Sequence, residues 1–103
     1  MINLLKEKKA ALANLCREHS IASLEVFGSA ADETFDSEQS DVDFLVEFLP
    51  GHDLGPWLAN YFAFQAALEE LLGRKVDLVV RSAMRNPYFI REVNRTRQVL
   101  YAA

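Results

Sequence analysis

Apolar residues along this chain recur with two periods, one typical of helices and one typical of strands. Leu5, Leu12 and Cys16 share a helical spacing with lysines between them, which predicts an amphipathic helix over residues 2–19. Residues 41–48 read Asp-Val-Asp-Phe-Leu-Val-Glu-Phe, the clearest strand pattern in the sequence, and a Pro-Gly pair at 50–51 ends it. The chain therefore combines helices with strands.

A second helix follows this strand. Proline is tolerated at the start of a helix because its missing N–H would be unpaired there, so we expect the helix to begin near Pro56. Glycine favours the end of a helix, and Gly73 marks it. Between them lies an aromatic stripe that we expect in the core rather than in a base-stacking platform: Trp57, Tyr61 and Phe64.

The remaining segments complete an α/β pattern. Residues 23–27 alternate polar and apolar up to Gly28, which predicts a strand closed by a tight turn and then a short helical turn. We also expect a strand over 75–80, a short helix entered at residues 86–87 and an edge strand over 98–101. This order predicts a small mixed β-sheet flanked by helices, in one domain spanning residues 1–103.

Composition narrows the class of protein. Cys16 is the only cysteine, so an intrachain disulfide and a cysteine-rich metal site are excluded, and its helical position predicts buried packing. The first residues lack the order of a signal peptide, and no apolar run approaches the roughly 20 residues that span a bilayer. These patterns indicate a cytoplasmic protein without a membrane segment.

Charge is distributed unevenly. Residues 25–47 hold eight acids and no Lys or Arg, whereas residues 81–97 hold five arginines and one acid. The net charge of −4 argues against autonomous nucleic-acid binding. The arginines at 85, 91, 95 and 97 fit either a solvated helix face or an interface for a partner.

The acidic run ends in carboxylates set into a strand. Side chains two apart on a strand share a face, so Asp41 and Asp43 project together while Val42 points to the opposite layer. Two carboxylates this close repel each other, and a divalent cation relieves the repulsion. Oxygen ligands alone favour Mg²⁺ or Mn²⁺. Asp77 sits similarly in its strand, and if the two strands are adjacent, three carboxylates converge.

Gly28 and Ser29 supply a second part of such a site. A glycine at a strand end lets the backbone approach a ligand closely, and a following helical turn offers N–H groups to phosphate oxygens. The Ser29 hydroxyl adds another donor. Phosphoryl and nucleotidyl transfer depend mainly on positioning and charge neutralisation, so a phosphate-binding turn beside metal-binding carboxylates predicts this chemistry.

At this point the chain resembles the nucleotidyltransferase superfamily related to DNA polymerase β, in its minimal (MNT) form. The resemblance covers nearly the whole length and implies the polymerase β-like nucleotidyltransferase fold. It is carried by residues 26–29 (Val-Phe-Gly-Ser), 40–48 (Ser-Asp-Val-Asp-Phe-Leu-Val-Glu-Phe), 76–79 (Val-Asp-Leu-Val), and the ending from 86–88 (Asn-Pro-Tyr) to 99–101 (Val-Leu-Tyr).

The resemblance implies roles for these residues. Asp41 and Asp43 would bind two Mg²⁺ ions, and Asp77 would complete the metal site near the attacking hydroxyl. Gly28 and Ser29 would hold the triphosphate of ATP, and Ser40 is expected among the nucleotide-binding residues.

The resemblance also implies a substrate and a partner. Such proteins typically transfer AMP from ATP, and minimal ones are often antitoxins paired with a HEPN-domain RNase toxin, whose tyrosine hydroxyl is the acceptor. ATP and a HEPN-domain protein are therefore the expected partners, and the assembly could be a homo- or hetero-oligomer.

One departure from the family pattern leaves two hypotheses. Relatives usually carry a basic residue and a glycine shortly after Gly-Ser, but here Asp32 stands where arginine is common. Losing that arginine removes a charge-assisted hydrogen bond of about 1.5–3 kcal/mol. The first hypothesis is an active AMP transferase. The second is a catalytically weak or inactive module that neutralises its partner by contact.

Overall fold

The computed structural model describes residues 2–32, 41–50 and 54–103, with the backbone alone at 29, 32 and 54–58. Two helices precede the first strand, helices and strands then alternate along the described residues, and a 3₁₀ turn, η1, follows the third strand. In chain order the elements are α1 (Asn3–Glu7), α2 (Lys9–Glu18), β1 (Ile21–Phe27), α3 (Ser29–Asp32), β2 (Val42–Phe48), α4 (Leu54–Leu72), β3 (Val76–Val80), η1 (Arg81–Ala83), α5 (Pro87–Thr96) and β4 (Gln98–Ala102).

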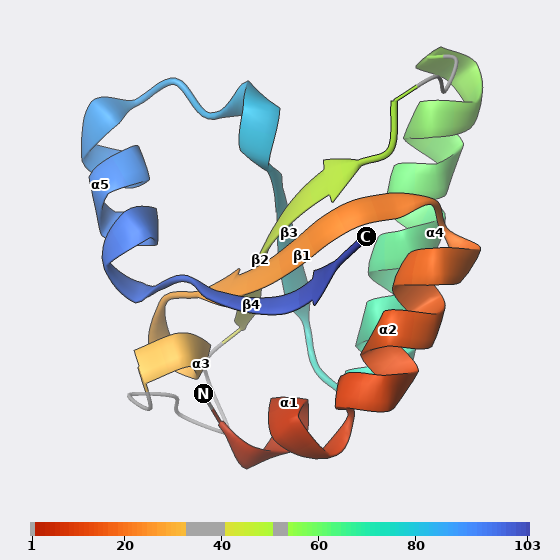
Figure 1. Cartoon of the computed structure of the whole chain (residues 1–103), viewed down its shortest axis with the longest axis horizontal. Helices are drawn as coiled ribbons and strands as arrows, with labels where there is room; N and C mark the ends of the chain where they lie inside the picture. Colours follow the sequence, from red (N-terminus) through yellow and green to blue (C-terminus); the bar gives the residue numbers. More distant parts are fainter. Residues whose placement is uncertain (1, 33–40, 51–53) are drawn as a thin grey trace.

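The four strands form one mixed sheet in the order β3-β2-β1-β4 (Figure 1). β1 is antiparallel to both β2 and β4, whereas β2 and β3 are parallel. Parallel neighbours need a long connection, and α4 provides it between β2 and β3. The expectation of a small mixed sheet flanked by helices is confirmed, and the two predicted site strands, β2 and β3, are neighbours.

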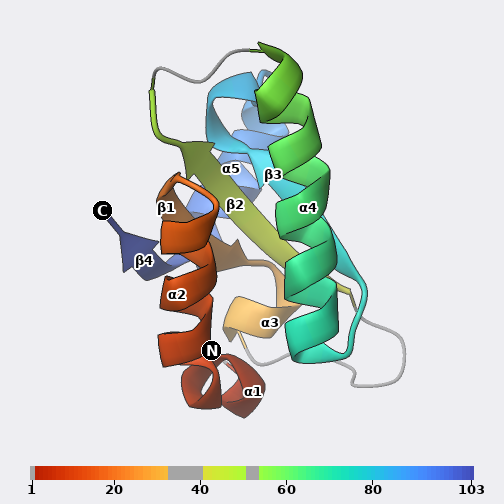
Figure 2. The ribbon, with the colours of Figure 1, turned by 90° about the vertical axis from the view of Figure 1, so that its right-hand side faces the viewer.

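One face of the sheet carries the main core. Figure 2 shows α2 and α4 in front of the sheet and α5 behind it. The largest fully buried side chains of this core include Phe44 and Val42 from β2, Val76 from β3, and Phe64 from α4. Because side chains alternate along a strand, burying Val42 and Phe44 here sends Asp43 to the opposite face.

Cys16 belongs to the same core, as its helical position predicts. Its side chain is fully buried. Burial raises the pKa of the Cys16 thiol to about 12, although the Arg17 guanidinium acts in the other direction. A thiol held neutral in an apolar core is inert, so packing is its role.

The opposite face is only partly covered. A smaller cluster of Phe27, Leu45 and Val93 packs there, and the Phe27 and Phe89 rings meet edge to face with centroids 5.9 Å apart. Asn86 caps the N-terminus of α5 by accepting hydrogen bonds from the backbone N–H groups of residues 88 and 89. This face is where the acidic side chains of β2 and β3 lie.

Three elements differ from the sequence expectations by more than one residue. The predicted helix over 2–19 is two helices, because Lys8 leaves helical geometry at ψ 9° after its N–H closes α1 on Leu4. β1 begins at Ile21 rather than 23, directly after Ser20, whose φ of 58° turns the chain. α4 begins two residues before Pro56, which stays within the first turn where no N–H is needed. Among the described residues, no helix combines the length and apolarity needed to cross a bilayer.

Candidate active site

Asp43 and Asp77 lie side by side on the partly covered face of the sheet. They are directly paired in the parallel register of β2 and β3. The Asp43 carboxyl is half-buried and Asp77 is exposed, and their side chains share a hydrogen bond. Burial raises the pKa of Asp43 to about 6, with further contributions from the charge and hydrogen bond of Asp77 and from the charge of Asp41.

Asp41 stands just before β2 and is half-buried. Its charge contributes to the raised pKa of Asp43, so it lies near the pair. Over residues 2–32, 41–50 and 54–103, however, no three His, Cys, Asp or Glu side chains are grouped closely enough to hold a metal ion. The structure therefore brings two of the three predicted carboxylates together.

The chemistry of these carboxylates fits a divalent cation. All the donors are oxygens, which favour Mg²⁺ or Mn²⁺. The raised pKa of Asp43 means that its negative charge is disfavoured beside Asp77. A bound cation would reverse that penalty. Residues 43 and 77 are thus the best candidates to hold a metal.

Gly28 packs directly against Asp43. Phe27 is paired with Asp43 in the antiparallel register of β1 and β2, so the turn after β1 lies beside the carboxylates. The backbone of Gly28 has φ 72°, and a Cβ atom there would stand 2.9 Å from Asp43 Oδ2. Glycine is required for two separate reasons: a left-handed backbone and space for the carboxylate.

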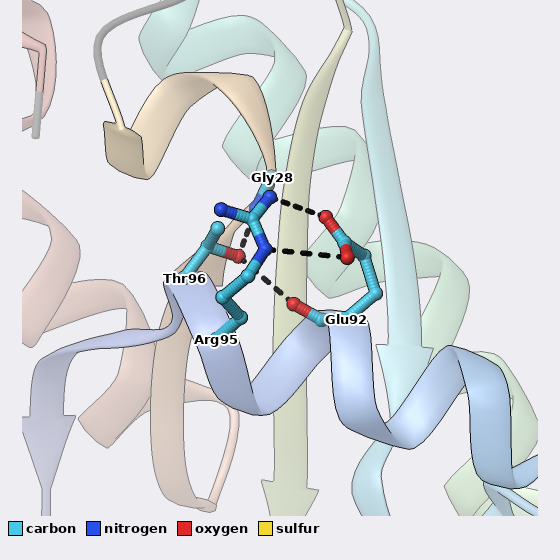
Figure 3. A network of polar contacts seen from close by, with 4 residues as sticks. All are labelled: Gly28, Glu92, Arg95 and Thr96. Carbon is cyan, nitrogen blue, oxygen red and sulfur yellow. Dashed lines mark hydrogen bonds and ion pairs between the residues drawn. The ribbon is translucent and has the colours of Figure 1, made fainter.

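The end of α5 holds the Gly28 turn, and sequence reasoning missed this. The Gly28 N–H donates to Thr96 Oγ1 at 2.9 Å, and the Thr96 hydroxyl donates to the Glu92 carbonyl at 3.4 Å (Figure 3). Thr96 is 7% exposed, one of two buried polar residues among those described. Its spacing after Phe89 and Val93 is the one available signal. Because the Gly28 N–H is engaged by Thr96, it would not itself be the donor to a phosphate at this turn.

The other predicted nucleotide-binding residues are only partly described. Ser29 is the first residue of α3, directly after Gly28, but its side chain lies outside the described part. The Asp32 side chain and the whole of Ser40 also lie outside it.

A pocket of about 320 Å³ opens over the carboxylate pair. Asp43 and Asp77 form part of its wall, together with Tyr61 and Gln65 from α4. A second pocket of about 650 Å³, mainly apolar, adjoins it through a shared wall that includes Tyr61 and Phe89. These volumes fall in the range of small-molecule sites, so the carboxylates face a space that a ligand can enter.

The arginine-rich segment serves two purposes. Arg97 pairs with the buried Glu25 at 3.5 Å, and Arg95 pairs with Glu92 on α5. Arg85 donates to two backbone carbonyls, those of residues 82 and 84. Arg91 is exposed on α5. Arg97 thus has a structural role, while Arg91 is available for a partner.

Carboxylates paired across parallel strands, beside a glycine turn and an open pocket, are typical of enzymes that transfer phosphoryl or nucleotidyl groups. Comparison with known proteins agrees with that class. Residues 8–100 match the family model described as the nucleotidyltransferase domain. The chain belongs to the nucleotidyltransferase family.

Individual relatives refine this assignment. The chain is 37% identical over 79 residues to a candidate protein adenylyltransferase of Methanocaldococcus jannaschii, covering 77% of this chain and 76% of that protein. A solved structure of a candidate minimal nucleotidyltransferase has a TM-score of 0.74 at 32% identity, covering 94% and 95% of the two chains. The fold is therefore that of the minimal nucleotidyltransferases, as the sequence motifs predict.

A more distant structural neighbour shares the fold alone. It is the complex of a tri-AMPylated HEPN toxin from Shewanella oneidensis with its MNT antitoxin. The TM-score is 0.65 at 17% identity, over 96% of this chain and 73% of that chain.

The contact between Gly28 and Asp43 predicts unequal effects of two glycine substitutions. Gly28→Ala and Gly73→Ala both place an alanine at positive φ, where the strain costs about 1–2 kcal/mol. Only at Gly28 does the new Cβ meet the Asp43 carboxylate; nothing lies within 4 Å at Gly73. We expect a larger loss of urea-unfolding free energy in Gly28→Ala than in Gly73→Ala, and a changed Asp43 carboxyl carbon chemical shift only in Gly28→Ala. Equal shifts in both variants would contradict the contact.

The raised pKa of Asp43 predicts a pH-dependent stability in the absence of metal. A proton bound more tightly in the folded state stabilises it below the ordinary value of 3.8, and this stabilisation is lost as pH rises through about 6. Asp43→Asn should therefore be more stable than the parent protein at pH 8, by about 1–2 kcal/mol after allowance for solvent screening, and nearly equal at pH 4.

Urea unfolding in EDTA at the two pH values measures this difference. Glu47→Gln is the matched control, since Glu47 lies on the same strand and face and its replacement keeps an acceptor for the Ser82 N–H. A less stable Asp43→Asn at pH 8 would refute the assignment of strain to Asp43.

Proposed function

We propose that this protein is a metal-dependent nucleotidyltransferase that moves AMP from ATP to a hydroxyl group of a partner protein. The observation that carries the proposal is the pairing of Asp43 with Asp77 in register, beside Gly28 and under an open pocket. The match to the nucleotidyltransferase family and the likeness to a candidate protein adenylyltransferase support the same reaction.

In this mechanism the residues bind, orient and accept a proton. Asp43, Asp77 and Asp41 would hold Mg²⁺, with Mn²⁺ as a substitute, and the turn at Gly28-Ser29, together with Ser40, would hold the triphosphate. Divalent cations bound there would neutralise phosphate charge and favour loss of the acceptor proton. The acceptor oxygen bonds to the α-phosphorus, the bond from that phosphorus to the bridging oxygen breaks, and pyrophosphate leaves. Asp77 would either accept that proton or hold the metal that acidifies the hydroxyl.

We further propose that the acceptor is a tyrosine of a HEPN-domain toxin and that this chain is the antitoxin. The support is the fold shared with an MNT antitoxin whose HEPN toxin partner is AMPylated. Blocking a toxin by covalent AMP transfer needs only one domain that holds ATP beside an open face. The pocket over Asp43 and Asp77, and the apolar pocket that adjoins it, lie on such a face.

The carboxylates predict a sharp loss of transfer on neutral substitution. Asp43→Asn and Asp77→Asn should each lower the rate of AMP transfer by at least about 100-fold, because charge neutralisation carries most of the catalysis. The assay follows label from [α-³²P]ATP onto a co-purified HEPN-domain partner, with [γ-³²P]ATP as the control for phosphoryl transfer. Glu47→Gln should keep the parental rate. Full transfer by Asp43→Asn would exclude this mechanism.

A second function rests on the surface of α5. Tyr88 is 76% exposed, and Phe89 and Arg91 are exposed beside it, which is the composition of a protein-binding surface. Together with Asp32 at a commonly basic position, this favours an alternative in which the protein neutralises its partner by contact alone.

The contact alternative makes an opposite prediction. Charge reversal in Arg91→Glu plus Arg95→Glu should weaken binding to the partner about tenfold or more, whereas Asp41→Asn leaves both binding and neutralisation unchanged. Calorimetric titration of the partner measures binding, and toxicity rescue in cells measures neutralisation. Lys9→Glu, an exposed reversal on α2, is the control. Neutralisation that is lost in Asp41→Asn while binding persists would reject contact as sufficient.

A further inference from the structure

Strand β3 lies at the edge of the sheet, and side chains of α4 occupy its outer backbone groups. Tyr61 donates its hydroxyl to the Leu78 carbonyl at 2.5 Å, and Gln65 Nε2 donates to the Val76 carbonyl at 3.0 Å. The Val76 N–H donates to Glu69 Oε2 at 3.0 Å. We call Tyr61, Gln65 and Glu69 the α4 polar row.

The spacing of helix and strand makes this row possible. Residues 61, 65 and 69 are four apart, so they lie on one side of α4 and advance about 6 Å per step. Two residues of a strand advance about 6.6 Å, which is nearly the same distance. One step along α4 therefore matches one step along β3, since Tyr61 binds Leu78 and Gln65 binds Val76, and α4 runs antiparallel to the strand beside it (Figure 2). Glu69, a further step along α4, binds the N–H of the same Val76.

The residue between the two held positions is Asp77. Val76 and Leu78 direct their backbone groups outward to α4, and the Lys75 carbonyl accepts from the Val42 N–H on the inner side. Because backbone groups alternate along a strand, those of Asp77 point inward to β2. Asp77 is thus held from β2 directly and from α4 through both neighbours.

The row also lies close to the candidate chemistry. Tyr61 and Gln65 line the pocket of about 320 Å³ together with Asp43 and Asp77. Phe64 and Leu68, on the adjoining side of α4, are fully buried in the core, so the helix is fixed relative to the sheet. A rigid helix, a matched spacing and three hydrogen bonds leave β3 little freedom to slide or twist.

We propose that Tyr61, Gln65 and Glu69 are positioning residues that hold the Asp77 carboxylate opposite Asp43, so that the pair is preorganised for a divalent cation. The inference rests on the proposed function, because it assigns a task to the same carboxylates. Covering the edge of β3 with α4 also prevents the strand from pairing with another chain. What the row adds is a fixed distance between two groups that repel each other.

The first test measures Mn²⁺ binding to the metal-free full chain by calorimetric titration. Gln65→Leu should raise the Mn²⁺ dissociation constant about threefold to tenfold, which is less than the roughly 10–100-fold typical of groups bonded directly to a metal ligand, because Gln65 acts through the backbone of the neighbouring Val76. Glu69→Leu should act likewise, and Glu69→Gln should restore binding because its side-chain oxygen still accepts from the Val76 N–H. Glu70→Leu, which faces α2, controls for the lost charge.

A double-mutant cycle separates positioning from general stability. If Gln65 acts through Asp77, Gln65→Leu adds no further loss of Mn²⁺ binding in an Asp77→Asn background. Circular dichroism first establishes that each variant is folded at the titration temperature. Should the leucine variants fail to fold, Tyr61→Phe removes one hydrogen bond with little change of shape and takes their place.

Hydrogen exchange of the metal-free protein tests the row without any metal. The Val76 amide should exchange at least about tenfold faster in Glu69→Leu than in Glu70→Leu. Any of three results would overturn the positioning role. The first is equal exchange of the Val76 amide in Glu69→Leu and Glu70→Leu, and the second is an Mn²⁺ affinity of Gln65→Leu within twofold of the parent. The third is a loss of Mn²⁺ affinity from Gln65→Leu that is as large in the Asp77→Asn background as in the parent. Absence of Mn²⁺ binding by the parent protein would instead refute the metal site of the proposed function, while exchange still decides whether the row holds β3.

Discussion

The parallel pairing of β2 with β3 is the constraint on which the rest of this structure depends. It sets Asp43 opposite Asp77, two groups that repel when both are charged. The residues on either side of this pair lie in the core: Val42, Phe44, Val76 and Leu78. Burying each such side chain is worth about 1.5–3 kcal/mol, whereas a charged Asp43, which is disfavoured first by its own burial and then by Asp77, costs about 1–2 kcal/mol after solvent screening. The free energy gained by burying these side chains therefore outweighs the cost at the carboxylates, and the two strands stay paired.

Much of this arrangement could be predicted from the sequence, because strand periodicity is local. Strand alternation predicts that Asp43 points away from the layer of Val42 and Phe44, and Gly28 at a strand end predicts the turn; both expectations agree with the structure. The unbroken first helix was wrong, since the chain leaves helical geometry at Lys8, where no glycine or proline marks a break in the sequence. Tyr61 was expected only as a core residue, yet it binds the Leu78 carbonyl and lines the pocket. Contacts between a helix and a strand edge cannot be inferred from either segment alone.

The C-terminal segment links the two faces of the molecule. Thr96 ends α5 at the Gly28 turn, and Arg97 pairs with Glu25 on β1, so the chain is anchored to β1 twice before β4 begins. Both anchors are buried or nearly so, and this leaves the start of α5, with Tyr88 and Arg91, as its exposed part. The arginines of this segment thus differ in role: Arg97 is ion-paired with Glu25 on β1, whereas Arg91 is exposed on α5. A partner that approached α5 would reach the pocket beside Phe89 at the same time.

A site built in this way is least stable when it is empty. The carboxylates that a cation needs are the ones whose proximity disfavours the metal-free fold, and Gly28 adds backbone freedom that the unfolded chain gains. Any ligand that binds the folded state offsets this cost by mass action. The hydrogen bonds of the α4 polar row oppose a movement of β3 away from β2, which would otherwise relieve the repulsion between the carboxylates. Holding two like charges in place requires support from outside the pair. Within the part of the chain that the structure describes, α4 is the only secondary-structure element whose side chains form hydrogen bonds with the outer edge of β3.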